Sequence, residues 1–247
     1  NLSDIPTEGT WLGSSSSFLV GLLLALSVLE GKHKSPLEIA EEACEIEINK
    51  CKKPIGKQDQ FAAAFGNLRK YDFKESSTQE YCYKMSEQEL LELSDNIIMF
   101  YTGTNRESKI ILKEQKENIE QGKIVEFLDK NVHLTEKMHR EFLMRSTKDF
   151  EIIGNYVKQN WELKKKFSSN ISNEFIDSII KRCYECKALG CKVLGAGGGG
   201  FILCIVNNED KKFIQNVISA EFNVRYMPVK IDIFGSRVLI NLEEYKW

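Results

Sequence analysis

The chain has 247 residues, of which 42% are hydrophobic and 28% are charged, so its composition excludes a disordered or collagen-like protein. The 34 basic and 36 acidic residues give a formal net charge of −2, which argues against a strongly basic nucleic-acid-binding protein. No segment reaches the roughly 18 consecutive apolar residues of a membrane span, so we expect neither a membrane nor a nucleic acid as a partner.

The first part of the chain carries two helical patterns and two strand-like segments. Gly31 ends the first helical pattern, and Ser35 with Pro36 provides an N-cap and a first-turn proline for the second. In chain order, the pattern predicts a helix, a second helix, a loop and two short strands, over about 14–30, 35–49, 50–59, 66–73 and 79–84.

The pattern changes near residue 95, where a compact apolar run at 96–101 predicts a buried strand. Long, charged and periodic stretches then predict four amphipathic helices, over 105–130, 132–148, 148–166 and 172–189. A strand, a helix and further strands are predicted at the end of the chain, over 201–206, 211–222 and 225–240. The sequence therefore predicts an α+β fold with two domains, residues 1–93 and 94–247.

Gly13 is followed by four serines, Ser14 to Ser17, directly before an apolar helical segment. Serine suits the start of a helix better than its interior, and a glycine lets a ligand approach the backbone closely. The N–H groups at a helix start carry partial positive charge, so this segment can cradle a phosphate. An ordinary serine-capped helix is the alternative.

Five of the six residues from Gly195 to Gly200 are glycines, and a strand pattern follows them. Ordering so many glycines costs backbone entropy, which indicates close backbone packing or positive φ angles along the segment. No Lys-Ser or Lys-Thr follows as in a P-loop. The segment also precedes a strand instead of joining a strand to a helix, which argues against a dinucleotide-dependent oxidoreductase. A flexible hinge is the alternative.

Three acidic residues, Glu45, Glu47 and Asp59, lie around the predicted loop at 50–59. Glu45 and Glu47 point about 200° apart on an α-helix, so they cannot both face one site. Mg²⁺ bound to ATP needs few protein oxygens, and one helical Glu with one loop Asp can supply them. Solvated surface carboxylates are the alternative.

The seven cysteines are an odd number without the spacing of a small disulfide-rich domain, which favours reduced thiols and a cytoplasmic location. Cys183, Cys186 and Cys191 resemble half of a zinc site. No second Cys-x-x-Cys follows, and the three histidines are distant in sequence, so we favour free thiols over structural zinc.

Three segments, in this order, resemble motifs of the GHMP small-molecule kinase superfamily. The segment LGSSSSFLVGLLLAL (12–26) resembles the second motif of that superfamily, and VLGAGGGGFILCIV (193–206) resembles the third. EEACEIEINKCKKPIGKQDQFAAAFG (41–66) is similar to the sugar-1-kinase branch, and most similar to the D-glycero-D-manno-heptose 7-phosphate kinases. Residues 101–106, 160–165 and 171–173 also resemble that branch.

The resemblance implies a cytoplasmic kinase that uses ATP and Mg²⁺ to phosphorylate the anomeric hydroxyl of a sugar phosphate, in carbohydrate metabolism that supplies surface polysaccharide. Asp59 would be the catalytic carboxylate, and Ser15 and Glu47 would be the Mg²⁺ ligands. The residues implied in nucleotide binding are Gly13, Ser14, Ser15, Ser16, Gly197 and Gly198, and those implied in substrate binding are Lys57, Arg106 and Gly199.

Two departures from the family pattern leave alternatives open. The family has an earlier segment before the phosphate loop, so the N-terminal domain is expected to lack its first strands. Trp11 stands where the family usually has a glycine. A fucose- or galactose-type sugar-1-kinase is one alternative, and a truncated or catalytically inactive nucleotide-binding relative is another. A homodimer also stays open.

Overall fold

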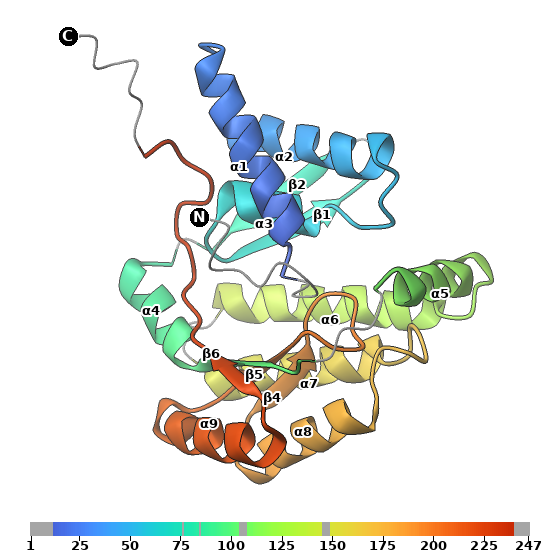
Figure 1. Ribbon diagram of the computed structural model, residues 1–247, viewed down its shortest axis with the longest axis vertical. Helices are drawn as coiled ribbons and strands as arrows, with labels where there is room; N and C mark the ends of the chain where they lie inside the picture. The colour runs from blue at the N-terminus through green and yellow to red at the C-terminus, as the bar shows by residue number, and fades with distance from the viewer. Residues whose placement is uncertain (1–11, 76, 84, 104–107, 145–148, 240–247) are drawn as a thin grey trace. The chain divides into compact units, whose positions relative to one another are not determined.

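The computed structural model describes residues 12–75, 77–83, 85–103, 108–144 and 149–239 (Figure 1). Contacts between Cα atoms divide the chain into two compact units. Of the described residues, the N-terminal unit comprises those in 13–85 together with 231–239, and the C-terminal unit comprises those in 86–230 together with Leu12. The domain ranges 1–93 and 94–247 stay a prediction, because contact-defined units and domains are different quantities.

The N-terminal unit consists of helices and one hairpin. Its elements are α1 (Ser14–Leu29), α2 (Pro36–Cys44), the π-helix η2 (Glu45–Lys50), α3 (Gln58–Phe65), β1 (Arg69–Phe73) and β2 (Thr78–Cys82). Ser35 accepts from the backbone N–H of Glu38 and Glu38 bonds back, so a capping box begins α2 where the sequence places an N-cap. The two predicted helices and the two predicted strands are confirmed. Residues 58 and 59 were predicted as loop but begin α3.

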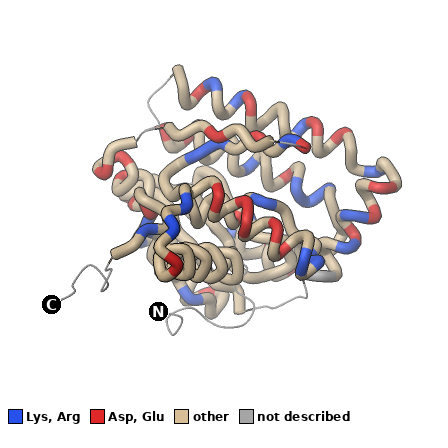
Figure 2. The backbone as a smooth tube through the Cα atoms, turned by 90° about the horizontal axis from the view of Figure 1, so that it is seen from above, with Lys and Arg blue, Asp and Glu red and all other residues tan. Residues whose placement is uncertain are grey.

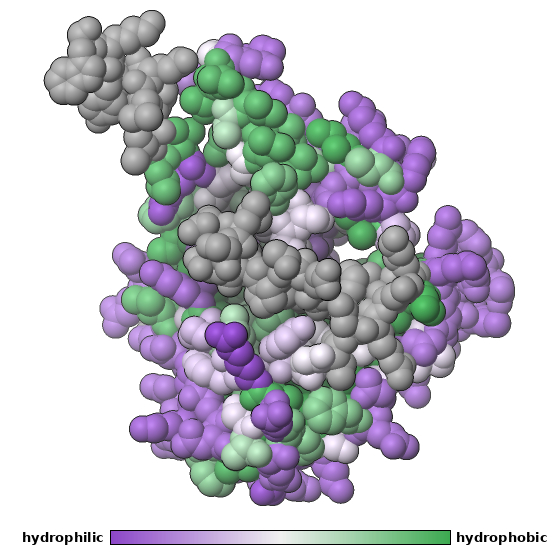
Figure 3. Space-filling model, viewed as in Figure 1, coloured by the Kyte–Doolittle hydropathy of each residue, from purple (hydrophilic) through white to green (hydrophobic). Residues whose placement is uncertain are grey.

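The core of this unit forms where α1, α2 and α3 pack together, around Val20, Ile39, Ala40, Phe61 and Ala64. The opposite face of α1 is apolar as well. Figure 3 shows hydrophobic residues gathered over this helix, where Phe18, Leu22, Leu26 and Leu29 are 41–69% exposed. Exposed apolar area of this kind is typical of an interaction surface.

The segment after residue 230 joins the N-terminal unit through backbone contacts. The N–H of Asn67 donates to the carbonyl of Asp232 at 2.6 Å, and the N–H of Ser236 donates to the carbonyl of Ala64 at 3.2 Å. Gly66 and Gly235 meet so closely that a Cβ on either would lie 2.2–2.4 Å from backbone atoms. Glycine is therefore required at both positions.

The C-terminal unit is built on a four-stranded antiparallel sheet in the order β4-β5-β3-β6. These strands are β3 (Ile97–Tyr101), β4 (Gly190–Val193), β5 (Phe201–Ile205) and β6 (Arg225–Met227). The central strands β3 and β5 are mostly buried, as their apolar runs predict. Of the strands predicted over 225–240, the described residues contain only β6. β4 was not predicted.

Helices cover both faces of this sheet. The described helices of this unit are α4 (Glu87–Asp95), α5 (Ser108–Glu120), α6 (Val125–Met144), α7 (Phe150–Lys164), α8 (Glu174–Glu185) and α9 (Asn208–Phe222), and α6 packs against α7. Lys192 of β4 bonds Asn160 of α7, whereas the preceding residue of the strand, Cys191, faces a cysteine cluster that includes Cys183 of α8. Because neighbouring residues of a strand point to opposite faces, α7 and α8 lie on opposite sides of the sheet.

Helix boundaries in the C-terminal unit differ from those predicted. The fourth predicted helix, 172–189, ends at Glu185, and the chain then turns into β4. The predicted break between 130 and 132 falls inside α6, and α4 was not predicted. The prediction of an α+β fold is confirmed.

The surface features of the described residues agree with the composition. Figure 2 shows basic and acidic residues interspersed along the helices. None of the described helices combines the length and the apolar character needed to cross a bilayer.

Candidate functional site

The N-terminal end of α1 has the geometry of an anion site. Gly13 is its N-cap residue with φ 67°, a left-handed conformation that favours glycine. Among the described residues no side chain caps this end. The first-turn N–H groups of a helix have no partner within the helix, so those of Ser14, Ser15 and Ser16 are placed to bind a negatively charged ligand.

Two of the serine hydroxyls converge on one carboxylate. Ser15 Oγ donates to Glu47 Oε1 at 2.7 Å, and Ser16 Oγ donates to Glu47 Oε2 at 2.6 Å. Glu47 is only 2% exposed and lies in the π-helix η2, whereas Glu45 of the same element is exposed and bonds Asn49. The two glutamates therefore have different surroundings, as expected, and π-helical turns are frequent at functional sites.

Glu47 is held as a carboxylate by its neighbours. Burial by itself would raise its pKa, but hydrogen bonds from Lys53, Ser16, Ser15 and Gln60 lower the pKa of Glu47 to about 2. The Gln60 amide donates to Glu47 Oε2 at 2.6 Å from a fully buried position. The Gln60 Oε1 atom is buried and has no donor among the described residues. Glu47 is therefore ionised at neutral pH.

Lys53 shows that this arrangement can hold a cation. Its ammonium group lies 2.7 Å from Glu47 Oε1 and 3.3 Å from Ser15 Oγ, the two side chains implied as Mg²⁺ ligands. Hard oxygen donors of this kind suit Mg²⁺, which takes few protein ligands when phosphates supply others. The residues present therefore fit a magnesium ion held by Ser15 and Glu47.

Asp59 lies beside the start of this phosphate-binding segment. It stands in the first turn of α3, and a Cβ added to Gly13 would lie 3.1 Å from its Oδ2 atom. The surrounding protein desolvates the carboxyl group although the side chain keeps contact with solvent, and the charge of Glu47 adds to this effect. Both causes raise the pKa of Asp59. A carboxylate with raised basicity next to a phosphate cradle is suited to accept a proton.

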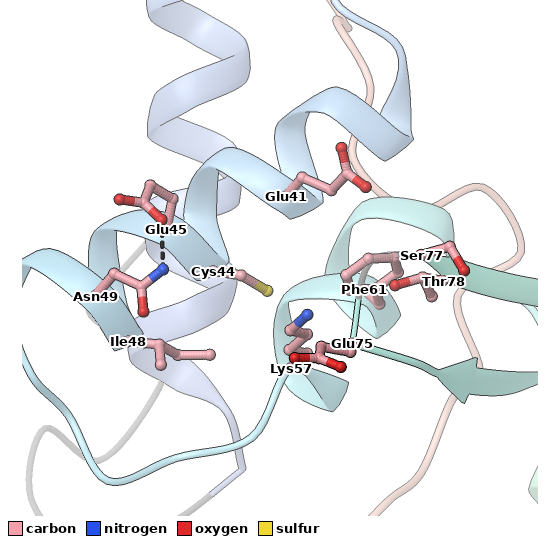
Figure 4. A pocket seen from close by; sticks show the side chains of 10 residues that line it. All are labelled: Glu41, Cys44, Glu45, Ile48, Asn49, Lys57, Phe61, Glu75, Ser77 and Thr78. Atoms are coloured by element: carbon pink, nitrogen blue, oxygen red, sulfur yellow. Dashed lines mark hydrogen bonds between the residues drawn. The ribbon is translucent and has the colours of Figure 1, made fainter.

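Lys57 lies at the N-cap of α3 and faces a pocket of about 240 Å³ (Figure 4). Figure 4 shows carboxylate, amide and hydroxyl groups on the wall of this pocket, together with the side chains of Cys44, Ile48 and Phe61. The carboxylates are those of Glu41, Glu45 and Glu75. The substrate-binding role of Lys57 stays a prediction.

The glycine-rich segment of the C-terminal unit is buried from Gly197 to Gly200 and is fixed by backbone contacts. The N–H of Gly198 donates to the carbonyl of Ile171 at 2.7 Å. Thr102 donates to the carbonyl of Gly200 from its N–H at 2.9 Å and from its hydroxyl at 3.0 Å. Gly197 has φ 103°, and a Cβ there would lie 3.0 Å from Ile171. These contacts favour a packed backbone over a flexible hinge.

A lysine that sequence reasoning did not select holds the first residues of this segment. Lys164 Nζ donates to the carbonyl of Val193 at 3.1 Å and to that of Gly195 at 2.5 Å. Burial, and then the nearby charge of Lys192, lower the pKa of Lys164 to about 7. The side chain therefore titrates near neutral pH.

The structure brings Gly13, Ser15, Ser16, Glu47 and Asp59 together in one unit. The residues Gly197, Gly198 and Gly199 belong to the other unit, and Arg106 and Trp11 lie outside the described residues. Sequence reasoning missed Lys53, Gln60 and Lys164. Of these three residues, only Gln60 could have been selected from the sequence, because it follows Asp59 directly and lies three positions after Lys57.

Comparison with protein-family models finds two matches. The N-terminal domain of GHMP kinases matches residues 2–67, and the C-terminal domain of GHMP kinases matches residues 138–224. The first match contains the serine segment with Glu47 and Asp59, and the second contains the glycine-rich segment.

Two relatives are similar over most of the chain. The D-glycero-alpha-D-manno-heptose 7-phosphate kinase of Campylobacter jejuni is 30% identical over 88% of this chain and 62% of its own length. The galactokinase of Pyrococcus furiosus is 27% identical over 90% of this chain and 68% of its own length. The chain thus spans 62% of the length of the first relative and 68% of the length of the second.

Solved structures show the same fold. A D-glycero-D-manno-heptose 1-phosphate kinase from Bacteroides thetaiotaomicron gives a TM-score of 0.67 at 24% identity, with coverage of 94% of this chain and 64% of that one. The galactokinase of Lactococcus lactis, solved with galactose, gives a TM-score of 0.70 at 16% identity, with coverage of 94% and 68%.

Proposed function

Because the chain belongs to the GHMP kinase family, we propose that it transfers the γ-phosphoryl group of ATP to a hydroxyl group of a sugar. The observation that carries this proposal is the cluster of Ser15, Ser16 and Glu47 at a helix N-terminus, with Asp59 beside Gly13. Phosphoryl transfer needs positioning and charge stabilisation more than covalent chemistry from the protein, and this cluster supplies both.

The first-turn N–H groups of α1 would bind phosphate oxygens and stabilise the charge that develops on them. Magnesium, when bound by Ser15 and Glu47, would neutralise phosphate charge. Asp59 would accept the proton of the sugar hydroxyl as the oxygen–phosphorus bond forms, and ADP would carry away the electrons of the broken bond. Gly197 and Gly198 would border the nucleotide, and Gly199 would border the sugar.

The finer proposal is that the acceptor is the anomeric hydroxyl of D-glycero-D-manno-heptose 7-phosphate. The 30% identity with the heptose 7-phosphate kinase of Campylobacter jejuni supports it. Arg106 and Lys57 would bind the substrate, and a guanidinium at Arg106 suits a phosphate group bidentately. The protein would then work in the cytoplasm and supply heptose for surface polysaccharide.

A galactokinase-type activity is the second candidate, because the galactokinase of Pyrococcus furiosus is similar over 90% of the chain. The two candidates differ in the phosphate group of the acceptor. ADP release should be measured with heptose 7-phosphate, unphosphorylated heptose, galactose and fucose. We expect ADP release with heptose 7-phosphate and not with the three unphosphorylated sugars. Preference for galactose would contradict the finer proposal.

The alternative that this chain is catalytically inactive is tested with the same protein. Calorimetric titration with MgATP measures nucleotide binding separately from turnover. Binding without ADP release on any sugar would contradict the kinase proposal and leave a nucleotide-binding protein. Absence of both would contradict the nucleotide site itself.

A further inference from the structure

Three cysteine side chains lie together in the core of the C-terminal unit. Cys183 comes from α8, Cys191 from β4 and Cys204 from β5, and all three are 0% exposed. The sulfur of Cys204 lies 3.3 Å from that of Cys191 and 3.8 Å from that of Cys183, and all three sulfurs lie within 4.8 Å of one another. Cys186 is buried nearby but is not part of this three-sulfur group.

The strand register produces this convergence. Cys191 and Cys204 are partners across β4 and β5. The register ends at Val193 and Ile202, and one step further the N–H of Leu194 donates to the carbonyl of Phe201. Hydrogen-bonded and non-hydrogen-bonded pairs alternate along an antiparallel ladder, so Cys191 and Cys204 form a non-hydrogen-bonded pair. Side chains of such pairs approach more closely than those of hydrogen-bonded pairs. Cys191 directs its N–H at 3.1 Å to the Tyr184 hydroxyl of α8, which ties the third element to the same place.

The spacing of the three sulfurs suits a single central ion. Metal–sulfur bonds of about 2.3 Å place three sulfurs about 4 Å or less from one another. Two of the sulfur–sulfur distances, 3.3 and 3.8 Å, meet this value, and the third is at most 4.8 Å. Shifts of less than about 1 Å would bring all three atoms into a common coordination sphere.

The number of ligands and the charge decide which ion fits. A structural zinc site needs four ligands, and no fourth Cys, His, Asp or Glu joins the cluster among the described residues. Zinc with three thiolates would also leave a net negative charge in a core of residues such as Ile179, Ile180 and Ile202. A trivalent ion with three thiolates is neutral and needs no fourth ligand.

We propose that Cys183, Cys191 and Cys204 bind a trivalent thiophilic ion of the arsenite class. Binding breaks three S–H bonds and three bonds between arsenic and hydroxyl oxygen, and forms three bonds between arsenic and sulfur. Each thiol proton leaves with one hydroxide as water, so three waters are released and no atom changes its oxidation state. Because the sulfurs are fully buried, binding requires transient opening between α8 and the sheet and is slow.

The test incubates the full chain with sodium arsenite under reducing conditions, removes the excess, and measures the intact mass. We expect the addition of one arsenic with the loss of three hydrogens. Cys191→Ala and Cys204→Ala should lose this addition. Cys186→Ala, which removes a buried thiol of the same core, and Cys51→Ala, which removes an exposed one, should keep it.

Arsenic X-ray absorption on the unaltered chain supplies a measurement that does not depend on the folding of a variant. Three sulfur neighbours and no oxygen neighbour would support the proposal. Two sulfurs with an oxygen, or an arsenic addition that survives Cys191→Ala in a folded protein, would overturn it. Tight zinc binding without arsenite binding would overturn it as well. None of these outcomes depends on whether the protein is a kinase.

Discussion

The two candidate phosphate-binding segments of this chain are built in different ways. In the N-terminal unit, Ser15 and Ser16 are organised by a buried, charged side chain, Glu47. In the C-terminal unit, the glycines at 195–200 are organised by backbone contacts to Ile171 and Thr102. The first site is therefore sensitive to charge and to individual side chains, whereas the second is sensitive to backbone shape.

The largest expected effect tests the reactive group of the N-terminal unit. Asp59→Asn should lower turnover by at least about a hundredfold, because an amide cannot accept the proton of the sugar hydroxyl. Steady-state ADP release measures it. Asp72→Asn, which changes another acid of the same unit near Lys70, should leave turnover unchanged. Near-normal turnover of Asp59→Asn would show that a different carboxylate is the base.

Gly13 gives the N-terminal site a left-handed backbone position, and a pair of variants tests its importance. Gly13→Ala and Gly31→Ala both force a side chain into a left-handed conformation, with φ 67° and 68°, at a cost of roughly 1–2 kcal/mol in stability. A Cβ at Gly13 would also press on Asp59, whereas a Cβ at Gly31 meets nothing within 4 Å.

Both variants should therefore melt at similar, lowered temperatures, but only Gly13→Ala should lose turnover. Thermal unfolding and ADP release measure the two quantities separately. Equal activity in the two variants would mean that the contact between Gly13 and Asp59 has no catalytic consequence.

The hydroxyl groups of the serine segment should have a smaller effect. Ser15→Ala removes an oxygen that contacts both Glu47 and Lys53, and hydrogen bonds to charged groups contribute about 1.5–3 kcal/mol. We expect MgATP to bind at least about tenfold more weakly. Ser17→Ala removes an exposed hydroxyl of the same segment and should bind normally. Identical affinities in both variants would exclude Ser15 from the metal site.

The smallest expected effect is on the pH dependence of stability, through Lys164 beside the glycine-rich segment of the C-terminal unit. The folded-state pKa of Lys164, about 7, lies below the ordinary value of 10.5, so the unfolded chain binds more protons between these pH values. The contribution of Lys164 to stability therefore rises with pH from about 7 toward about 10. Urea unfolding should show a steeper rise in the unaltered protein than in Lys164→Met. Parallel pH profiles would contradict the lowered pKa.

Part of the candidate site could be predicted from the sequence because glycine and serine patterns depend only on neighbouring residues. Gly13 with four serines predicts a helix start, and the residues at 195–200 predict a special backbone, without any tertiary information. The roles of Lys53 and Lys164 could not be found in this way, because Lys53 acts on a residue six positions earlier and Lys164 on a carbonyl 31 positions later. Lysines of a charged chain are mostly solvated, and only packing singles these two out.

The fold was predicted least well where tertiary contacts determine which residues form a strand or join a unit. β4 is a short strand after a helix, and its pairing with β5 depends on a partner 13 residues away at Cys191 and Cys204. The return of residues 231–239 to the N-terminal unit depends on the contact between Gly66 and Gly235. The cysteine cluster was missed because local spacing groups Cys183 with Cys186, whereas strand register brings in Cys204.

The central claim is that Glu47 and Ser15 hold magnesium with the phosphates of ATP. The most direct measurement is a calorimetric titration of ATP into the unaltered protein and into Glu47→Gln, each with magnesium and with a chelator. The unaltered protein should bind MgATP much more tightly than metal-free ATP, and Glu47→Gln should lose this difference. Equal binding of MgATP and metal-free ATP by the unaltered protein would contradict the claim.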